Sequence, residues 1–265
     1  MALPLLGAGL SVDTAPAPPF TPTSIAGLRL WLDSSDAATL FTDSAGTIPA
    51  ILDGDPIGKW SDKSGSNNNV VQSDGTKKPL LKKTIQNGKS VVRGDGVNDA
   101  LESATGGEDS PFTLFVVTIS RLNGTVMAPF GVGELVLRKG RVLAKTTSNL
   151  MQFQGYTTLT SNYNCLVNSS LSWSSGTALI AQMKYDSGYI SLAKDAGAFS
   201  TPTLPVNFYG QNLLSYVSSV IRIFLNGNSG PYNGDICEVL YYGAALTDSN
   251  KNAITGYLNT KWSVY

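Results

Sequence analysis

Three short motifs that could support chemistry overlap between residues 87 and 101, in the sequence NGKSVVRGDGVNDAL. GKS ends the phosphate-binding loop of many nucleotide-binding proteins, RGD is a cell-adhesion tripeptide, and DGVND begins like a calcium-binding loop. Each of these functions requires further residues at fixed spacing. The spacing therefore decides which chemistry this segment can support.

The phosphate-loop and calcium-loop interpretations both fail on spacing. A phosphate loop needs a glycine five residues before Gly88, because that glycine starts the turn whose N–H groups hold phosphate, and the chain has Lys83 there. A calcium loop that starts at Asp95 needs an oxygen ligand where the chain has Val97. The RGD at 93–95 is flanked by valines typical of a strand, whereas an adhesion site must project from a loop. We predict that GKS and RGD are both inert.

The composition excludes several classes of function. The chain has no histidine, which removes the commonest general base and the commonest zinc ligand. Its 19 basic and 19 acidic residues give no net charge, whereas a nucleic-acid partner needs a basic face. No apolar stretch approaches the roughly 20 residues of a membrane span, and the opening MALPLLGAGL lacks the basic residues of a secretory signal. We expect no nucleic-acid partner, no membrane partner and no export by that route.

The acidic residues and the cysteines do not form a recognisable catalytic pattern. Glycoside hydrolases place two carboxylates across the bond they cleave, whereas Glu134 and Glu238 are isolated acids within apolar strands. We therefore predict that the protein is not an enzyme and has no catalytic residue. Cys165 and Cys237 are too few for a disulfide scaffold, and two free thiols are favoured over one disulfide.

Short apolar runs separated by Gly, Asn, Ser and Asp predict one all-β domain over residues 25–265. The expected strands have the sequences GLRLWLD, SVVRGDGV, FTLFVVTIS, GELVLRKGRVLAK, LIAQMKYDSGYISLAK, SVIRIFLNG and DICEVLYY. Two of these runs contain hairpins, with turns at 186–188 and near Gly140. A short helix is expected near residues 248 to 260, with Thr247 as its N-cap. Its apolar face should carry Ile254, Tyr257, Leu258 and Trp262.

Residues 1 to 24 form a separate N-terminal segment. The sequence APAPPFTPT contains four prolines, which predicts an extended, semi-rigid arm. Exposed apolar side chains on such an arm are unfavourable unless a partner covers them, so a docking arm and a disordered tail are both open hypotheses. We predict that residues 1 to 20 lie against another chain rather than on their own domain. The side chains that would dock are Leu3, Leu5, Leu6 and Phe20.

Three sequence blocks together resemble a known family. They are LRLWLDSSDAATL followed by KWSDKSGSNNNVVQ, then NGKSVVRGDGVNDAL, and finally YNGDICEVLYYGAALTDSNKNAITGYLNTKW. These blocks resemble the laminin-G-like, concanavalin A-like jelly-roll domains common in bacteriophage structural proteins and bacterial surface proteins. The second block departs from the usual pattern, with Gly94 in place of an aromatic residue, Asn98 in place of an acid and Ala100 in place of tyrosine. Residues 102–230 match only as generic strands.

The resemblance implies an antiparallel jelly-roll β-sandwich whose first and last blocks meet in space. Trp31 and Trp60 are then expected to fill the sandwich core. Four aspartates are expected to form turns: Asp33, Asp36, Asp62 and Asp95. The weaker alternative is a calcium site shared by Asp62, Asp95 or Asp99, and no other cofactor is expected.

Two functions compete at this point. The leading hypothesis, implied by the resemblance, is a structural protein on the virion surface of a bacteriophage. Such a protein would be a capsid decoration (cement) protein or a knob or tail appendage, with other virion proteins as partners, and would form a homo-oligomer such as a trimer. The alternative is a carbohydrate-binding module for host-surface glycans. Its candidate ligand-binding residues are the aromatics of the least family-like region, although such residues are more often buried: Tyr163, Trp173, Tyr209 and Tyr216.

Overall fold

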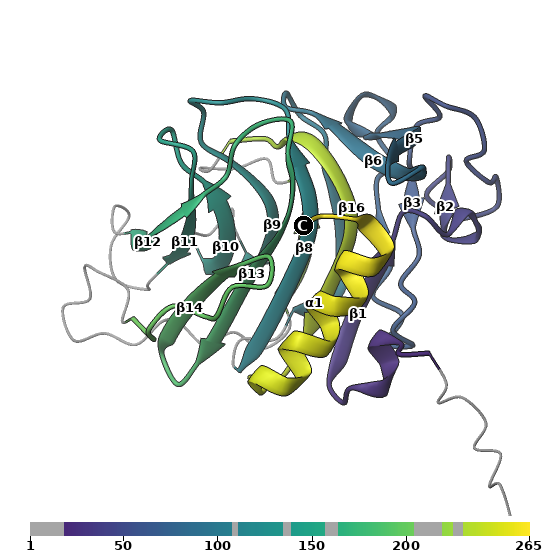
Figure 1. The fold of residues 1–265 in the computed structure, drawn as a ribbon. Helices are drawn as coiled ribbons and strands as arrows, with labels where there is room; N and C mark the ends of the chain where they lie inside the picture. Colours follow the sequence, from purple (N-terminus) through teal and green to yellow (C-terminus); the bar gives the residue numbers. More distant parts are fainter. Residues whose placement is uncertain (1–18, 108–110, 135–138, 157–163, 204–218, 225–229) are drawn as a thin grey trace, which may run out of the picture.

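The computed structural model describes residues 19–107, 111–134, 139–156, 164–203, 219–224 and 230–265. In these residues the chain forms two antiparallel β-sheets packed face to face, and one helix, α1 (Asp248–Trp262), covers the outer face of the first sheet (Figure 1). The predicted antiparallel β-sandwich with a C-terminal helix is confirmed.

Every strand pair among the described residues is antiparallel. The first sheet has the strand order β14 (Tyr189–Lys194), β13 (Ala178–Asp186), β8 (Phe112–Ser120), β16 (Asn233–Tyr242), β6 (Lys89–Asp95) and β5 (Leu80–Gln86), with β1 (Leu28–Asp33) also paired to β16. The second sheet has the order β12 (Asn164–Ser172), β11 (Leu150–Tyr156), β10 (Lys139–Lys145), β9 (Met127–Glu134), β15 (Ser219–Ile223), β7 (Leu101–Gly107), β4 (Val70–Val71), β3 (Lys59–Trp60) and β2 (Leu40–Phe41). Short 3-10 turns occur at Pro22–Ser24, Ala37–Thr39 and Gly75–Lys77.

The first and last sequence blocks meet in space, as predicted. β1 pairs with β16 from Leu28 opposite Tyr242 to Asp33 opposite Glu238. In Figure 1, β1 and β16 lie side by side beneath α1. Strands from the two ends of the chain therefore share one sheet, and the described part of the domain is a single sandwich.

The centre of the first sheet is buried on both faces, which explains the nearly continuous apolar sequence of its central strand. All nine residues of β8 are buried. Leu114 and Val116 face the second sheet, whereas Phe115 and Val117 pack in the layer beneath α1. A strand covered on both sides must be apolar on both, so the alternation expected of a half-exposed strand is lost.

The helix forms where the sequence predicts it. Thr247 is its N-cap, since the hydroxyl oxygen accepts a hydrogen bond from the Asn250 N–H. Ile254, Leu258 and Trp262 are buried against the first sheet. A helix of 15 residues with an interior glycine is stabilised mainly by this packing.

Two predicted details are wrong. Trp31 does not fill the sandwich core, as Trp60 does, but lies half-buried on the outer face of the first sheet beside the helix. The reason is strand alternation, which directs Leu30 and Leu32 into the core and Trp31 away from it. The second detail is the position of a turn: β9 and β10 form the predicted hairpin, but Gly140 lies within β10, where it pairs with Gly133, rather than at the turn.

Candidate functional site

The predicted ligand-binding residues do not assemble into a site among the described residues. Trp173 is fully buried in the sandwich core, where its ring packs 6.4 Å from that of Tyr232. A side chain enclosed by the core cannot stack on a ligand, so this prediction is corrected. Tyr163, Tyr209 and Tyr216 lie outside the described residues.

The end of the N-terminal arm contacts its own domain. The ring of Phe20 lies 5.8 Å from that of Tyr257 on α1, and the Tyr242 hydroxyl donates a hydrogen bond to the carbonyl of Pro22. The prediction that Phe20 lies away from its own domain is therefore wrong, and the packed part of the chain begins several residues before residue 25. The predicted docking residues Leu3, Leu5 and Leu6 lie outside the described residues.

The RGD tripeptide is part of β6, as predicted. The Arg93 guanidinium donates two hydrogen bonds to the Asp235 carboxylate, from Nε to Oδ1 (2.5 Å) and from Nη2 to Oδ2 (2.8 Å). A Cβ added at Gly94 would lie 2.6 Å from the carbonyl oxygen of Tyr232, so only glycine fits there. The Asp95 carboxylate accepts hydrogen bonds from the two N–H groups of the following turn. All three residues therefore have structural contacts.

Asp62 forms a turn, as predicted. Its carboxylate accepts hydrogen bonds from the backbone N–H groups of Trp31, Ser64 and Asn68 and from the Ser64 hydroxyl. These donors use both carboxylate oxygens. Within the described ranges, no group of three or more His, Cys, Asp or Glu residues is placed to hold a metal ion.

Asp95 and Asp99 form a separate carboxylate pair after β6. Asp99 is buried, and its Oδ2 accepts a hydrogen bond from the Asp95 N–H at 2.9 Å. Burial, together with the charge of Asp95, raises the pKa of the Asp99 carboxyl to about 6. Asp99 is therefore a buried acid with a raised pKa in the loop between β6 and β7.

A fully buried carboxylate joins the first and last sequence blocks beneath α1. Glu238 Oε1 accepts hydrogen bonds from Trp31 Nε1 (2.7 Å) and the Tyr257 hydroxyl (2.9 Å). Its Oε2 accepts from Trp262 Nε1 (2.6 Å) and lies 2.8 Å from Lys261 Nζ. Burial raises the pKa of the Glu238 carboxyl, and Lys261 acts in the opposite direction.

The charges of this cluster continue to the surface. Lys261 Nζ also lies 2.7 Å from Asp33 Oδ1, and Asp33 Oδ2 lies 2.9 Å from Lys63 Nζ. Burial acts to raise the pKa of Asp33, but Lys261, Ser35 and Lys63 hold it below its usual value. Because four donors already engage Glu238, neither of its oxygens is left to accept a proton from a substrate. The cluster therefore attaches the helix to the sheet.

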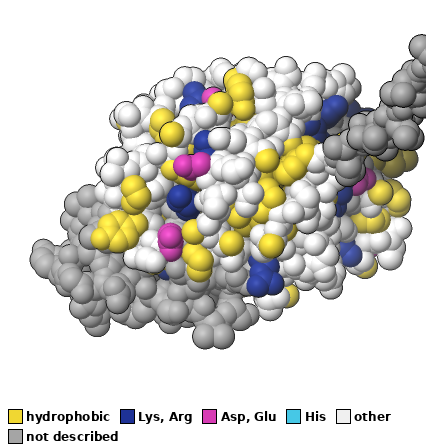
Figure 2. Space-filling view, turned by 60° about the horizontal axis from the view of Figure 1, so that its bottom comes forward, with side chains coloured by type: hydrophobic (Ala, Val, Ile, Leu, Met, Phe, Trp, Pro, Cys, Tyr) yellow, Lys and Arg dark blue, Asp and Glu magenta, His cyan; other side chains and the backbone are white. Residues whose placement is uncertain are grey.

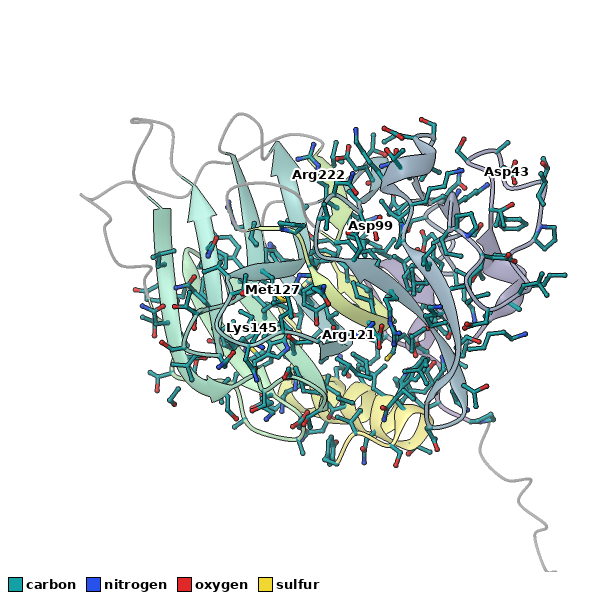
Figure 3. All side chains as sticks on the ribbon, turned by 90° about the horizontal axis from the view of Figure 1, so that it is seen from above. Asp43, Asp99, Arg121, Met127, Lys145 and Arg222 are labelled. Carbon is teal, nitrogen blue, oxygen red and sulfur yellow. The ribbon has the colours of Figure 1, made fainter. Side chains whose placement is uncertain are left out.

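A buried lysine stands at the opposite side of the sandwich, and sequence analysis did not identify it. Lys145 on β10 is fully buried, and its Nζ donates to Ser120 Oγ (2.9 Å), Asn123 Oδ1 (3.2 Å) and the Leu122 carbonyl. Figure 3 shows it beside Met127, its partner across the β9–β10 ladder. Burial lowers the pKa of Lys145 to about 8. Three neutral oxygens hold this amine, which fixes the start of the loop after β8.

A groove of about 260 Å³ lies where the edge strands of the two sheets approach each other. β12 ends the second sheet, and β14 ends the first. The segment 198–203 runs along β14, with Ser200 N–H donating to the Leu192 carbonyl at 2.8 Å. The floor of the groove is aliphatic, formed by the buried or half-buried Val167, Leu171 and Leu192, and the exposed Ala198 also lines the groove. Its rim is uncharged and polar, formed by Asn168, Ser169, Ser170, Ser200 and Thr203.

A β-bulge shapes the β12 side of this groove. The register of β12 against β11 shifts between the pairs Leu150–Ser172 and Gln152–Asn168. Within the irregular stretch, Ser169 Oγ donates to the Met151 carbonyl (2.7 Å) and accepts from the Leu171 N–H (3.2 Å). Bulges at sheet edges redirect side chains and interrupt strand pairing. Here the bulge turns a short run of serines toward the groove.

A row of side-chain amides fixes the end of the rim. Asn168 Oδ1 accepts a hydrogen bond from Gln152 Nε2 (2.5 Å), and Gln152 Oε1 accepts one from Gln154 Nε2 (2.7 Å). Gln152 and Gln154 are buried on β11, whereas Asn168 is exposed at the groove. The amide of Asn168 is therefore held in one orientation at the rim of the groove.

A second hollow is smaller and less suited to a ligand. It has a volume of about 130 Å³ and lies between the loop after β1 and strands β5 and β6. The Ser34 hydroxyl in its wall already donates to the carbonyls of Ser90 and Cys237. The β12–β14 groove is the stronger candidate site.

Cys237 is a buried free thiol, as predicted, whereas the side chain of Cys165 lies outside the described parts.

No protein-family model and no curated protein sequence matches the chain. Solved structures share its fold at low identity. Domain 4 of AbnA, a GH43 extracellular arabinanase from Geobacillus stearothermophilus solved with arabinotriose, has a TM-score of 0.59 at 11% identity, covering 86% of this chain and 98% of that domain. The binding domain of Paraclostridial Mosquitocidal Protein 1 has a TM-score of 0.59 at 12% identity, covering 90% of this chain and 54% of that one. A GH54 α-L-arabinofuranosidase has a TM-score of 0.55 at 14% identity, covering 89% of this chain and 63% of that one.

These comparisons establish the β-sandwich fold. At identities of 11 to 14% they show the fold alone. None of the three structures is described as a virion protein. In the described residues, no helix combines the length and the apolar character needed to cross a membrane.

Proposed function

We propose that this protein is a non-catalytic carbohydrate-binding module and that the β12–β14 groove is its glycan site. One observation carries the proposal: a groove at the sandwich edge has an aliphatic floor and a rim of hydroxyl and amide groups. Ligand sites are mostly apolar concavities with a few placed polar groups, and this groove has that composition. Its volume of about 260 Å³ suits a single sugar ring better than a larger ligand.

The chemistry of the groove suits a sugar in two ways. A pyranose or furanose ring has C–H groups that pack on aliphatic side chains such as Leu171 and Leu192. Its hydroxyls both donate and accept, as do the Ser170 and Ser200 hydroxyls and the Asn168 amide. Since the lining contains no acid or base, binding without bond cleavage is the function it can perform.

The structural similarity to other proteins also favours the glycan-binding hypothesis. Domain 4 of the arabinanase was solved in complex with arabinotriose, and the arabinofuranosidase also acts on a sugar. This chain covers nearly all of the arabinanase domain, so the likeness concerns a whole module. We therefore rank the glycan-binding hypothesis above the virion hypothesis.

The experiment is a glycan array followed by titration calorimetry with arabinotriose and the best array ligand. Ala198 is exposed in the groove, so Ala198→Trp should fill it and weaken binding at least tenfold. Ala196, two residues earlier in the chain, is exposed but does not line the groove, which makes Ala196→Trp the matched control. No binding on the array, or equal binding by both variants, would exclude this site.

A structural role on the surface of a phage virion is a second proposal, and the N-terminal sequence supports it. Leu3, Leu5 and Leu6 precede a proline-rich segment, and apolar side chains on such an arm favour a partner surface. The partners would be other virion proteins, and the assembly would be a homo-oligomer such as a trimer. Finding the chain at a fixed, symmetric copy number in purified particles would support this role, and its absence from particles would refute it.

A further inference from the structure

Two long stretches of the sequence contain no charged residue, although 14% of the chain is charged. Neither residues 146–183 nor residues 196–221 include a single Lys, Arg, Asp, Glu or His. These stretches supply β11, β12, most of β13 and the segment that runs along β14. All of the residues that line the β12–β14 groove except Leu192 come from them. The lining of the groove is therefore free of charged side chains.

The charged residues that border the uncharged region are engaged in other contacts. Lys194, at the end of β14, lies 3.9 Å from Asp195 Oδ2 and 3.4 Å from the Ser172 hydroxyl. Asp195 accepts a hydrogen bond from the Ile180 N–H through Oδ1 (2.9 Å). Neither Lys194 nor Asp195 lines the groove.

The rest of the surface is different. On the face drawn in Figure 2, basic and acidic side chains are scattered among uncharged groups, and some of them lie next to each other. On the opposite side of the fold, Lys63, Asp36, Lys82 and Asp53 form exposed or half-exposed ion pairs. The uncharged groove is therefore a local feature and not a consequence of low charge everywhere.

We infer that the groove binds a neutral glycan and rejects sugars that carry carboxylate or sulfate groups. This inference rests on the proposed glycan-binding function and names the ligand class of that same site. An anionic group that enters the groove loses water and gains only neutral donors, whereas sites for carboxylates and sulfates use Arg or Lys. Removing sugar hydroxyls from water costs less free energy, because the serine, threonine and asparagine groups of the groove replace their hydrogen bonds to water.

Two further properties follow from the same lining. Binding should be insensitive to salt, since no ion pair forms between ligand and protein. It should also be independent of divalent cations, because the groove has no carboxylate that could hold one. Both properties can be measured with the wild-type protein.

The test compares ligands that differ only in charge. Polygalacturonate and the same polymer after chemical reduction of its carboxyl groups form one such pair, and sialyllactose and lactose form another. A glycan array ranks neutral and acidic ligands, and calorimetry then measures the best neutral ligand at 50 mM and 500 mM NaCl and with EDTA. For any pair that binds, we expect the Kd of the neutral member to be at least tenfold lower than that of the acidic member. The Kd of the best neutral ligand should change less than twofold with salt or EDTA.

A gain-of-charge variant makes the test independent of which glycan is found. Ser170→Lys places a cation on the exposed rim, so it should improve binding of acidic glycans at least fivefold and make it salt-dependent. Preference for acidic glycans by the wild type, abolished by Ala198→Trp, would refute the neutral class while leaving the glycan site intact. No binding of any glycan would refute the proposed function itself.

Discussion

Replacing Glu238 by glutamine removes one buried charge and tests the cluster that attaches α1 to the first sheet. The carboxylate accepts from two indole N–H groups and a phenol hydroxyl and pairs with Lys261, at distances of 2.6 to 2.9 Å. A glutamine amide of the same size offers one oxygen and one NH₂ group. In either orientation of the amide, its NH₂ group faces N–H or O–H groups that are themselves hydrogen-bond donors. Lys261 also loses the negative charge of its buried partner.

The expected loss is about 3 to 5 kcal/mol in the free energy of unfolding. Breaking a buried ion pair by removing one partner costs this much, because the remaining charge stays buried and uncompensated. Hydrogen bonds to charged groups contribute about 1.5 to 3 kcal/mol each, so losing more than one accounts for the same range. Part of the cost is relieved by Asp33, which lies 2.7 Å from Lys261 Nζ.

Urea unfolding monitored by tryptophan fluorescence measures this change, because Trp31 and Trp262 both contact Glu238. Glu102→Gln is the control: Glu102 is about half exposed and pairs with Arg222, so its loss should cost less than 1 kcal/mol. A Glu238→Gln variant as stable as the control would show that the cluster contributes little and that packing alone holds the helix.

Three further predictions concern single positions and the arm. Gly94→Ala should destabilise the domain by about 2 to 3 kcal/mol, because the added Cβ meets Phe224 and lies 2.6 Å from a carbonyl oxygen; Gly256→Ala, in the open interior of α1, should stabilise it by about 0.5 to 1 kcal/mol in the same unfolding assay. Asp99 has a pKa of about 6 in the folded state and 3.8 as a free group, so the folded state binds more protons in that window and stability falls as pH rises through it. Asp99→Asn should remove this loss of stability. Relative to wild type, the variant should therefore be more stable at pH 7 than at pH 4.5 by about 1 to 2 kcal/mol in the free energy of unfolding, after allowance for solvent screening; a variant whose stability depends on pH as the wild type's does would contradict the raised pKa of Asp99. Deleting residues 1–18 should leave the melting temperature within about 2 °C of the full-length value, because the described contacts of the arm begin at Phe20, while weakening incorporation into any particle that contains the protein; normal incorporation would show that the arm is only a tail.

Much of the fold could be predicted from the sequence because its strongest signals are local. β8 and β16 are apolar runs bounded by turn residues, and the KYDSGYISL hairpin turns at Ser187 and Gly188, both of which have positive φ. The pairing of β1 with β16 is long-range and could be expected only from the resemblance to jelly-roll domains.

The parts that could not be predicted depend on which face a side chain takes. Trp31 and Trp60 both lie in strands, yet one lies beneath the helix and the other in the core. Strand alternation separates them only when the bulges and register of each strand are known. β12 was missed because its sequence NCLVNSSLS is polar, and the groove beside it depends on a bulge and on contacts with residues 198–203.

The central claim is that the β12–β14 groove binds a glycan, and the most direct test is to locate the bound ligand on the domain. Backbone ¹H–¹⁵N NMR spectra recorded during titration with the best array ligand report each N–H group separately. We predict that the shift changes concentrate in Asn168–Leu171 and Ala198–Thr203. Changes concentrated around the smaller hollow at Ser34 and Ser90, or spread without a centre, would contradict the account.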